Sequence, residues 1–288
     1  MTIQIRPQDL PELRAELAAF TASPEGTEYW ADHQALEYYQ SFSRKASYLS
    51  EVVAESLSGE LFAVTGPMAE LAATAGQSLE LFETEEADLP CRSGVLVFEQ
   101  PPQLLRGRDE DGGTVTMHGA AWTFRDDGSG PYAWVTPLAW PNEGSKLLLG
   151  GPRVIPFSLR DLPPMTRQRN GFDDLITTLR SAWLLMQQPL ANNHTVQPDR
   201  AARKRLRRLD REPSPVRVIE LRRPKHTSEA GQGDSDREYH HQWIVRGHWR
   251  QHWHPKRQVH RPIWIAPHVK GPEGAPLIGG EKVYRLKR

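Results

Sequence analysis

Apolar residues recur every three to four positions over much of the first 90 residues. In residues 7–20 the apolar stripe consists of Leu10, Leu13, Leu17 and Phe20. This spacing predicts an amphipathic helix, because residues three and four apart share a helix face. Comparable patterns predict further helices over residues 28–39, 46–57 and 67–75, with a short apolar strand at 60–64. Residues 1–90 are therefore predicted to be mainly helical.

From residue 94 the hydrophobic period shortens to two, which is typical of strands. Short apolar or alternating segments, separated by glycine-rich turn signals, predict strands at 95–98, 114–118, 132–140, 153–157, 216–221 and 282–286. The connections within 94–157 are mostly too short for helical crossovers, which favours antiparallel pairing.

Residues 172–188 carry the strongest helical pattern of the chain. Its broad apolar stripe consists of Leu175, Ile176, Leu179, Ala182, Trp183 and Met186. Two aspartates in the first turn complement the helix dipole. The predicted fold class is α+β, with a mixed, mostly antiparallel sheet packed on this long helix. The predicted parts are residues 1–90 and 91–288, with one continuous domain as the alternative.

A basic, histidine-rich segment occupies residues 239–272, which hold seven of the eleven histidines, four of the nine tryptophans, six Lys or Arg and no Asp or Glu. Strict alternation predicts a strand over 242–254. One face carries Arg246, His248, Arg250, His252 and His254. The other face, expected in the core, carries Trp243, Val245, Trp249 and Trp253. With a second strand at 262–266, the segment is predicted to be a β-hairpin.

Charge is unevenly distributed, although 36 Lys and Arg balance 36 Asp and Glu. Residues 1–100 hold 5 basic and 17 acidic side chains, a net −12, whereas residues 189–288 hold 22 and 10, a net +12. This asymmetry indicates an anionic partner for the C-terminal third. The alternative, given equal weight, is that the acidic first third packs on the basic last third.

The densest positive charge lies in residues 198–213, where seven cations fall within twelve residues. Such a run binds nucleic acid or forms a solvated connector. Together with the hairpin it suggests that phosphates are bound by Arg203, Lys204, Arg205, Arg207, Arg208, Lys256, Arg257 and Arg261. Trp264 is the candidate for stacking on bases.

Two histidines and a cation on one surface suffice for metal-free cleavage of RNA, as base, acid and stabiliser of the charged intermediate. The hairpin offers His248, His268, Arg246, Arg250 and Lys270 as candidate catalytic residues. The same side chains would serve binding alone. A zinc site is disfavoured because arginines flank the histidines and the segment has no carboxylate, so no metal or other cofactor is expected.

Several motifs of the C-terminal third carry a resemblance. They are Leu179-x-x-x-Trp183-x-Leu185-Met186-Gln187-Gln188, VRVIELRR from Val216, WIVRGHWR from Trp243 and WIAPHVKGP from Trp264. Together they resemble a family of uncharacterised actinobacterial proteins, often carried by plasmids, integrative elements and phages. The resemblance covers roughly the last 110 residues and implies an accessory protein of a mobile element, with no settled activity.

These features predict a nucleic-acid-acting accessory protein of a mobile element, with RNA as the favoured ligand and cleavage left open. The rival hypothesis is a structural or protein-interaction module whose acidic and basic regions pack together, so that the partner is an acidic protein surface. Walker A, Gly-x-Ser-x-Gly and zinc-finger motifs are absent. Without a signal-peptide pattern or a membrane-spanning apolar run, a cytoplasmic location and no membrane partner are expected.

Overall fold

The computed structural model describes residues 4–80, 82, 85–108, 114–126, 131–141, 148–150, 153–156, 171–222, 241–272 and 276. The chain divides into two compact units, Met1–Arg222 and Arg223–Arg288. The sequence-based boundary near residue 90 differs from this division, because a strand that precedes residue 90 lies inside the sheet of the first unit.

The first unit is built on a mixed sheet with the strand order β6-β5-β4-β2-β1-β9-β8, to which β3 adds beside β4 and β7 beside β5. The strands are β1 (Glu60–Val64), β2 (Ser93–Phe98), β3 (Arg106–Arg108), β4 (Thr114–Asp126), β5 (Pro131–Pro141), β6 (Leu148–Leu149), β7 (Arg153–Pro156), β8 (Ala191–Val196) and β9 (Val216–Leu221). Only β1 pairs in parallel, with β2 and with β9, among the described strands. The predicted α+β class with a mixed, mostly antiparallel sheet is confirmed.

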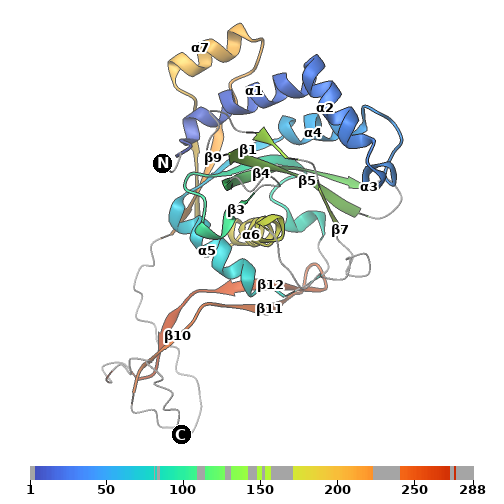
Figure 1. The fold of residues 1–288 in the computed structure, drawn as a ribbon. Helices are drawn as coiled ribbons and strands as arrows, with labels where there is room; N and C mark the ends of the chain where they lie inside the picture. Colours follow the sequence, from blue (N-terminus) through green and yellow to red (C-terminus); the bar gives the residue numbers. More distant parts are fainter. Residues whose placement is uncertain are drawn as a thin grey trace, which may run out of the picture. The chain divides into compact units, whose positions relative to one another are not determined.

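Helices cover both faces of this sheet (Figure 1). They are α1 (Leu10–Ala22), α2 (Pro24–Gln34), α3 (Glu37–Gln40), α4 (Tyr48–Ser58), α5 (Gly66–Gln77), α6 (Gly171–Met186) and α7 (Arg200–Arg208). Figure 1 shows α1, α2 and α4 on one face and α5 and α6 on the other. The single helix predicted over 28–39 was wrong: α2 begins at Pro24, where the Ser23 side chain accepts a hydrogen bond from the Gly26 amide. None of the helices in the described part of the chain combines the length and the apolarity needed to cross a bilayer.

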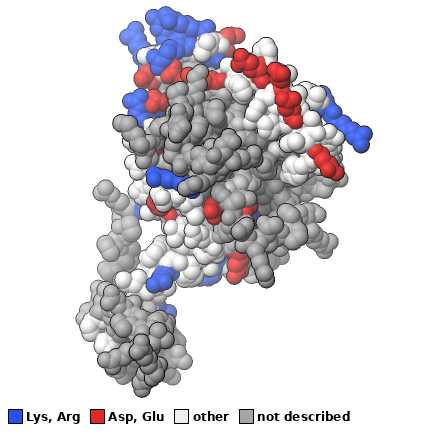
Figure 2. Space-filling model, viewed as in Figure 1, with Lys and Arg blue, Asp and Glu red and all other residues white. Residues whose placement is uncertain are grey.

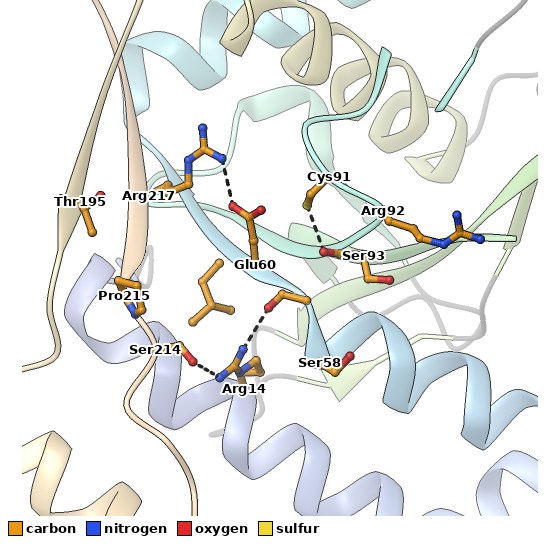
Figure 3. A pocket seen from close by; sticks show the side chains of 12 residues that line it. Arg14, Ser58, Glu60, Cys91, Arg92, Ser93, Thr195, Ser214, Pro215 and Arg217 are labelled. Carbon is orange, nitrogen blue, oxygen red and sulfur yellow. Dashed lines mark hydrogen bonds and ion pairs between the residues drawn. The ribbon is translucent and has the colours of Figure 1, made fainter. Parts of the chain in front are cut away.

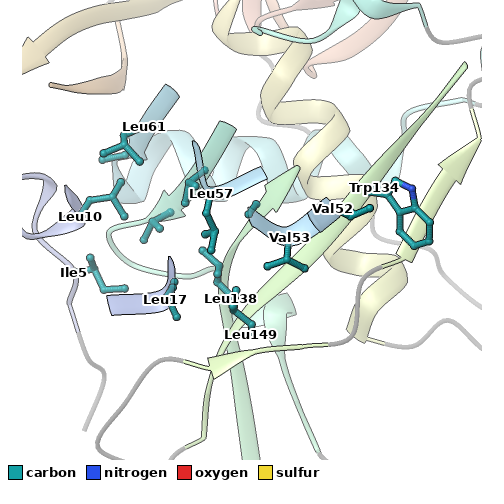
Figure 4. Close-up of a cluster of buried hydrophobic side chains, with 14 of the residues drawn as sticks. Ile5, Leu10, Leu17, Val52, Val53, Leu57, Leu61, Trp134, Leu138 and Leu149 are labelled. Carbon is teal, nitrogen blue, oxygen red and sulfur yellow. The ribbon is translucent and has the colours of Figure 1, made fainter. Parts of the chain in front are cut away.

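The central strands are buried on both sides, which explains their uninterrupted apolar sequences. In β1 the side chains of Leu61 and Ala63 join the cluster formed with α1, α2 and α4, part of which Figure 4 shows. Phe62 points to the opposite face and lies 5.7 Å from Trp122 of β4, measured between ring centroids. Trp122 in turn lies 5.3 Å from Trp183 of α6, so the long helix packs on the sheet as predicted.

The second unit contains the predicted hairpin, with two corrections. Its strands are β10 (Trp243–Val245), β11 (His248–His254), β12 (Val259–Ile265) and β13 (His268–Lys270). The strand predicted over 242–254 is interrupted at residues 246–247, and the second strand begins earlier than predicted, at Val259. The strand predicted at 282–286 lies outside the described residues.

A buried histidine occupies a bulge of β4. The β4–β5 register shifts between Met117 and Gly119, and Gly119 has a φ of +157° at a place where an added Cβ atom would lie 1.9 Å from the Leu96 carbonyl oxygen. His118 beside it is only 2% exposed. Burial, and then the positive charge of Arg106, lower the pKa of His118 from 6.5 to about 4.

We predict that this histidine makes the first unit acid-sensitive. Because the folded-state pKa is depressed, the unfolded chain binds the proton more readily between pH 6.5 and about 4. The contribution of the neutral His118 side chain to the free energy of unfolding is therefore complete above pH 6.5 and is lost as the pH falls towards 4. The loss for this one side chain is about 3 kcal/mol. Urea unfolding of the protein and of His118→Gln at both ends of this range measures the difference. Equal pH dependence of the two proteins would show that His118 does not titrate in this way.

Candidate nucleic-acid interface

Helix α7 forms over residues 200–208 of the basic run 198–213, and both of its ends are capped. The Asp199 carboxylate accepts a 2.7 Å hydrogen bond from the Ala202 amide, which caps the N-terminus and lowers the pKa of Asp199. At the C-terminus Asp210 has a φ of 54°, and the amide of Arg211 donates to the Leu206 carbonyl at 2.9 Å. This is a Schellman ending. Residues 200–208 of the run are therefore helical, whereas residues 211–213 have no regular secondary structure.

One side of α7 is fixed to the first unit. Ala202 and Leu206 are 3% and 1% exposed. Arg205, on the same side, forms an ion pair with Glu12 of α1 through two hydrogen bonds. Arg205 is therefore engaged within the chain, which corrects its assignment to the free phosphate-binding residues.

The exposed side of α7 carries five cations and, as its one uncharged residue, Ala201. The five cations occur at positions i, i+3, i+4, i+7 and i+8, which share one helix face, and we call them the cationic stripe. Its members are Arg200, Arg203, Lys204, Arg207 and Arg208, all exposed. In the part of the chain that the structure describes, none of them forms an ion pair with a carboxylate. Figure 2 shows the Lys and Arg side chains gathered over α7 at the top of the view.

The second unit presents one long antiparallel ribbon, although its pairing is interrupted in the middle. Val245 pairs with His268 and, three residues further on each arm, His248 pairs with Ile265, so the register is unchanged across the gap. Gly247 lies in the gap, where a Cβ atom would approach the Trp264 ring to 2.4 Å. The glycine is needed because the indole of Trp264 packs directly on the backbone there.

The two faces of β11 differ as the alternation predicts only near Trp249, because Gln251 and Trp253 of the predicted core face are exposed. His248, Arg250 and His252 share one exposed face, and His254 at its end is half-buried. On the other face Trp249 packs edge-on against Trp264 with ring centroids 5.3 Å apart. Trp253 was expected in the core but is 41% exposed.

Two residues predicted to contact nucleic acid are too buried for that role. Trp264 is 8% exposed and Arg261 is 7% exposed. The remaining hairpin residues predicted as candidates are exposed, namely Arg246, His248, Arg250, Lys256, Arg257, His268 and Lys270. Lys256 and Arg257 belong to the four-residue turn that joins β11 to β12, which begins with Pro255 and contains Gln258 with a φ of 54°.

The two candidate catalytic histidines lie on different arms at opposite ends of the gap. The Nδ1 atom of His248 lies 3.0 Å from the Arg246 carbonyl, and that of His268 lies 3.1 Å from the Ala266 carbonyl. Since a carbonyl only accepts, each Nδ1 is the donor, and in the neutral ring Nε2 carries the lone pair. The two residues are three pair positions apart, about 10 Å along a strand. They are not direct cross-strand neighbours, so the pairing does not bring base and acid to one phosphate.

In the described residues there is no group of three or more His, Cys, Asp or Glu side chains placed to hold a metal ion. The aromatic rings of His252 and His254 lie 5.2 Å apart, edge to face.

Sequence reasoning missed one member of the cationic stripe, Arg200, and included one residue outside it, Arg205. The spacing of the cations would have predicted the stripe correctly, because positions 200, 203, 204, 207 and 208 repeat with the helical period and position 205 does not belong to that set.

Comparisons with known proteins give no family. No protein family matches this sequence, and none of the curated proteins matches it. Among solved structures, the crystal structure of AcrVA2 aligns over 92% of this chain and 86% of that chain, at 14% identity and a TM-score of 0.42.

We predict that Gly247→Val disrupts the ribbon. Its side chain would collide with Trp264, and overpacking of this kind costs about 1–3 kcal/mol. Limited proteolysis should then cut within residues 241–272 faster than in the parent protein, with the first unit unaffected. Ala266→Val, at an exposed position in the same gap, is the matched control and should be cut at the parent rate. Equal protection of Gly247→Val would contradict the close packing of Trp264 on this glycine.

Proposed function

We propose that this protein binds single-stranded RNA, and that each unit contributes a binding surface of its own: the cationic stripe of α7 in the first unit and the exposed basic face of the ribbon in the second. The observation that carries the proposal is the stripe itself, five cations on one face of a nine-residue helix whose other face is fixed to α1. The helix spacing gives the stripe a length of about 12 Å, enough to contact more than one phosphate. The C-terminal motifs, which resemble proteins of plasmids and phages, are in keeping with such a role.

The ribbon adds groups that favour a single strand over a duplex. Trp253 is 41% exposed, and the next residues along the chain include Lys256 and Arg257 in the turn. The Trp253 ring contacts the His260 ring, with centroids 5.0 Å apart, and its exposed part suits unstacked bases, which a single strand offers and a duplex does not. In addition, the deep and narrow major groove of an RNA duplex does not admit side chains of a helix. We therefore infer a ligand bound by its phosphates and by base stacking, without sequence readout through a groove.

A second candidate function is binding to an acidic protein surface. The observation that favours it is the Arg205–Glu12 ion pair, in which a helix of this chain already uses a carboxylate as the partner of the basic run. Titration with RNA and with polyglutamate of the same charge distinguishes the two, because bases can stack on Trp253 and carboxylate side chains cannot. We expect RNA to bind the more tightly.

We predict that RNA affinity depends on the stripe and not on the total charge of α7. Arg203→Gln should weaken binding and reduce the slope of log affinity against log salt by about 0.7, the contribution of one phosphate contact to a single strand. The matched control is Arg205→Gln, which removes the same charge from the face held by Glu12. It should change the affinity much less. Affinity that does not respond to salt, or equal losses in both variants, would rule out the stripe as the RNA-binding surface.

We predict binding without cleavage. His248 and His268 are exposed, but they are separated by three pair positions, and general acid–base catalysis requires both groups within reach of one phosphate. RNA incubated with the protein in excess EDTA should remain intact, as judged by gel electrophoresis. Cleavage that His248→Ala and His268→Ala each abolish would contradict this prediction and assign the histidines to catalysis.

A further inference from the structure

A recess of about 630 Å³ opens in the first unit where β1, β2 and β9 begin (Figure 3). Its walls come from segments far apart in the sequence: α1, the start of β1, residues 91–93 before and at the start of β2, the end of β8, and the loop between α7 and β9. The volume lies in the range of small-ligand sites in proteins. The side chains that line it include three arginines, Arg14, Arg92 and Arg217, and one acid, Glu60.

Arg14 and Ser214 meet in this recess. The Arg14 guanidinium donates to the Gly59 carbonyl at 3.1 Å and to the Ser214 hydroxyl oxygen at 2.8 Å. Because Ser214 accepts this bond through its oxygen, its own proton remains able to donate to a ligand. A guanidinium has five N–H donors, so two such contacts leave Arg14 further donors for an oxyanion.

The other two arginines are already compensated. Arg217 forms a 3.0 Å ion pair with Glu60 and lies over the ring of Phe62. Arg92 forms a 3.1 Å ion pair with Glu86. Arg14, by contrast, forms no ion pair with any carboxylate in the described residues. It is therefore the cation of the recess whose charge a ligand would balance.

A second cation adds to the positive potential at Arg14. Partial burial, and then the charge of Arg211, lower the pKa of Arg14. Arg211 lies in the same loop as Ser214 and forms no ion pair with a described carboxylate. A half-buried cation beside a second cation is unfavourable unless an anion accompanies it. A phosphate monoester carries nearly two negative charges at neutral pH, which matches these two arginines.

The single cysteine of the chain lines the recess but is not suited to react there. Cys91 donates a 3.0 Å hydrogen bond to the Ser93 carbonyl. Burial, and then the charge of Glu60, raise the pKa of its thiol to about 12. Since the thiolate is the nucleophilic form, the recess has the features of a binding site and not those of a thiol-dependent catalytic site.

We infer that the recess binds a phosphate monoester group, with Arg14 and Ser214 as its hydrogen-bond donors. The group belongs either to a free mononucleotide or to the 5′ end of an RNA strand. The second source rests on the proposed function, because the strand would then also be held by the cationic stripe. The loop that carries Ser214 directly follows α7 in the chain, which places both features on one segment of the first unit.

The test uses the full chain and measures binding of AMP, of adenosine, and of one RNA oligonucleotide with either a 5′ phosphate or a 5′ hydroxyl. If the ligand is a free mononucleotide, AMP should bind and adenosine should not. If it is the 5′ end of an RNA strand, the 5′-phosphorylated strand should bind about tenfold more tightly than the 5′-hydroxyl strand. Arg14→Gln should remove this preference, and Ser214→Ala should weaken it. Binding of the 5′-hydroxyl strand should stay unchanged in both variants.

Arg14→Lys guards against a loss of folding in the glutamine variant. It keeps the positive charge but has a single donor nitrogen, whereas Arg14 binds Gly59 and Ser214 through two different nitrogens of its planar guanidinium, so the preference should still fall. Equal affinities for AMP and adenosine, together with equal affinities for the 5′-phosphorylated and the 5′-hydroxyl strand, would overturn the inference. Salt-dependent binding of the 5′-hydroxyl strand would in that case still support the proposed function. Conversely, AMP binding that depends on Arg14, with no RNA binding at low salt, would overturn the proposed function alone.

Discussion

The burial of β1 between two parallel neighbours is the constraint on which the first unit depends. Leu61 to Val64 are all buried, and the strand pairs with β2 on one side and with β9, more than 150 residues later in the chain, on the other. Parallel neighbours require crossover connections, and buried strands require helices on both faces. The position of β9 in turn brings α7 and its following loop beside α1, where Glu12 pairs with Arg205 and Arg14 bonds to Ser214. The cationic stripe and the recess are thus consequences of how one apolar strand is covered.

On α7 and on β11 of the ribbon, the charged side chains lie on a different face from the packed apolar side chains because both kinds of residue repeat with the period of the helix or strand. On the helix, burial of Ala202 and Leu206 directs five cations to the opposite side. On the ribbon, packing of Trp249 against Trp264 occupies one face of β11, so His248, Arg250 and His252 take the exposed one. In both cases a small apolar contact orients a larger number of charges, and the described part of the second unit has no carboxylate to neutralise them.

Much of the fold could be predicted from the sequence because hydrophobic periodicity reports local structure directly. The strands at 60–64 and 216–221 have the predicted bounds, and the helix of 172–188 forms as α6. Two kinds of feature could not be predicted. The first is the burial of Trp264 and Arg261, which depends on tertiary packing. The second is the hydrogen-bond partners of Arg205 and Arg14, which lie 193 and 200 residues away in the sequence. Alternation assigns a face to a side chain, but it does not say what covers that face.

The most direct test of RNA binding by these surfaces is covalent labelling of lysine amines with and without single-stranded RNA at low salt, read by mass spectrometry. Lys204 of the cationic stripe and Lys256 of the ribbon turn are exposed, and we expect RNA to lower the reactivity of both. Lys45, which is ion-paired with Glu51 in the first unit, is the internal reference and should keep its reactivity. Unchanged labelling of Lys204 and Lys256, or equal protection of Lys45, would contradict the assignment of these surfaces to RNA.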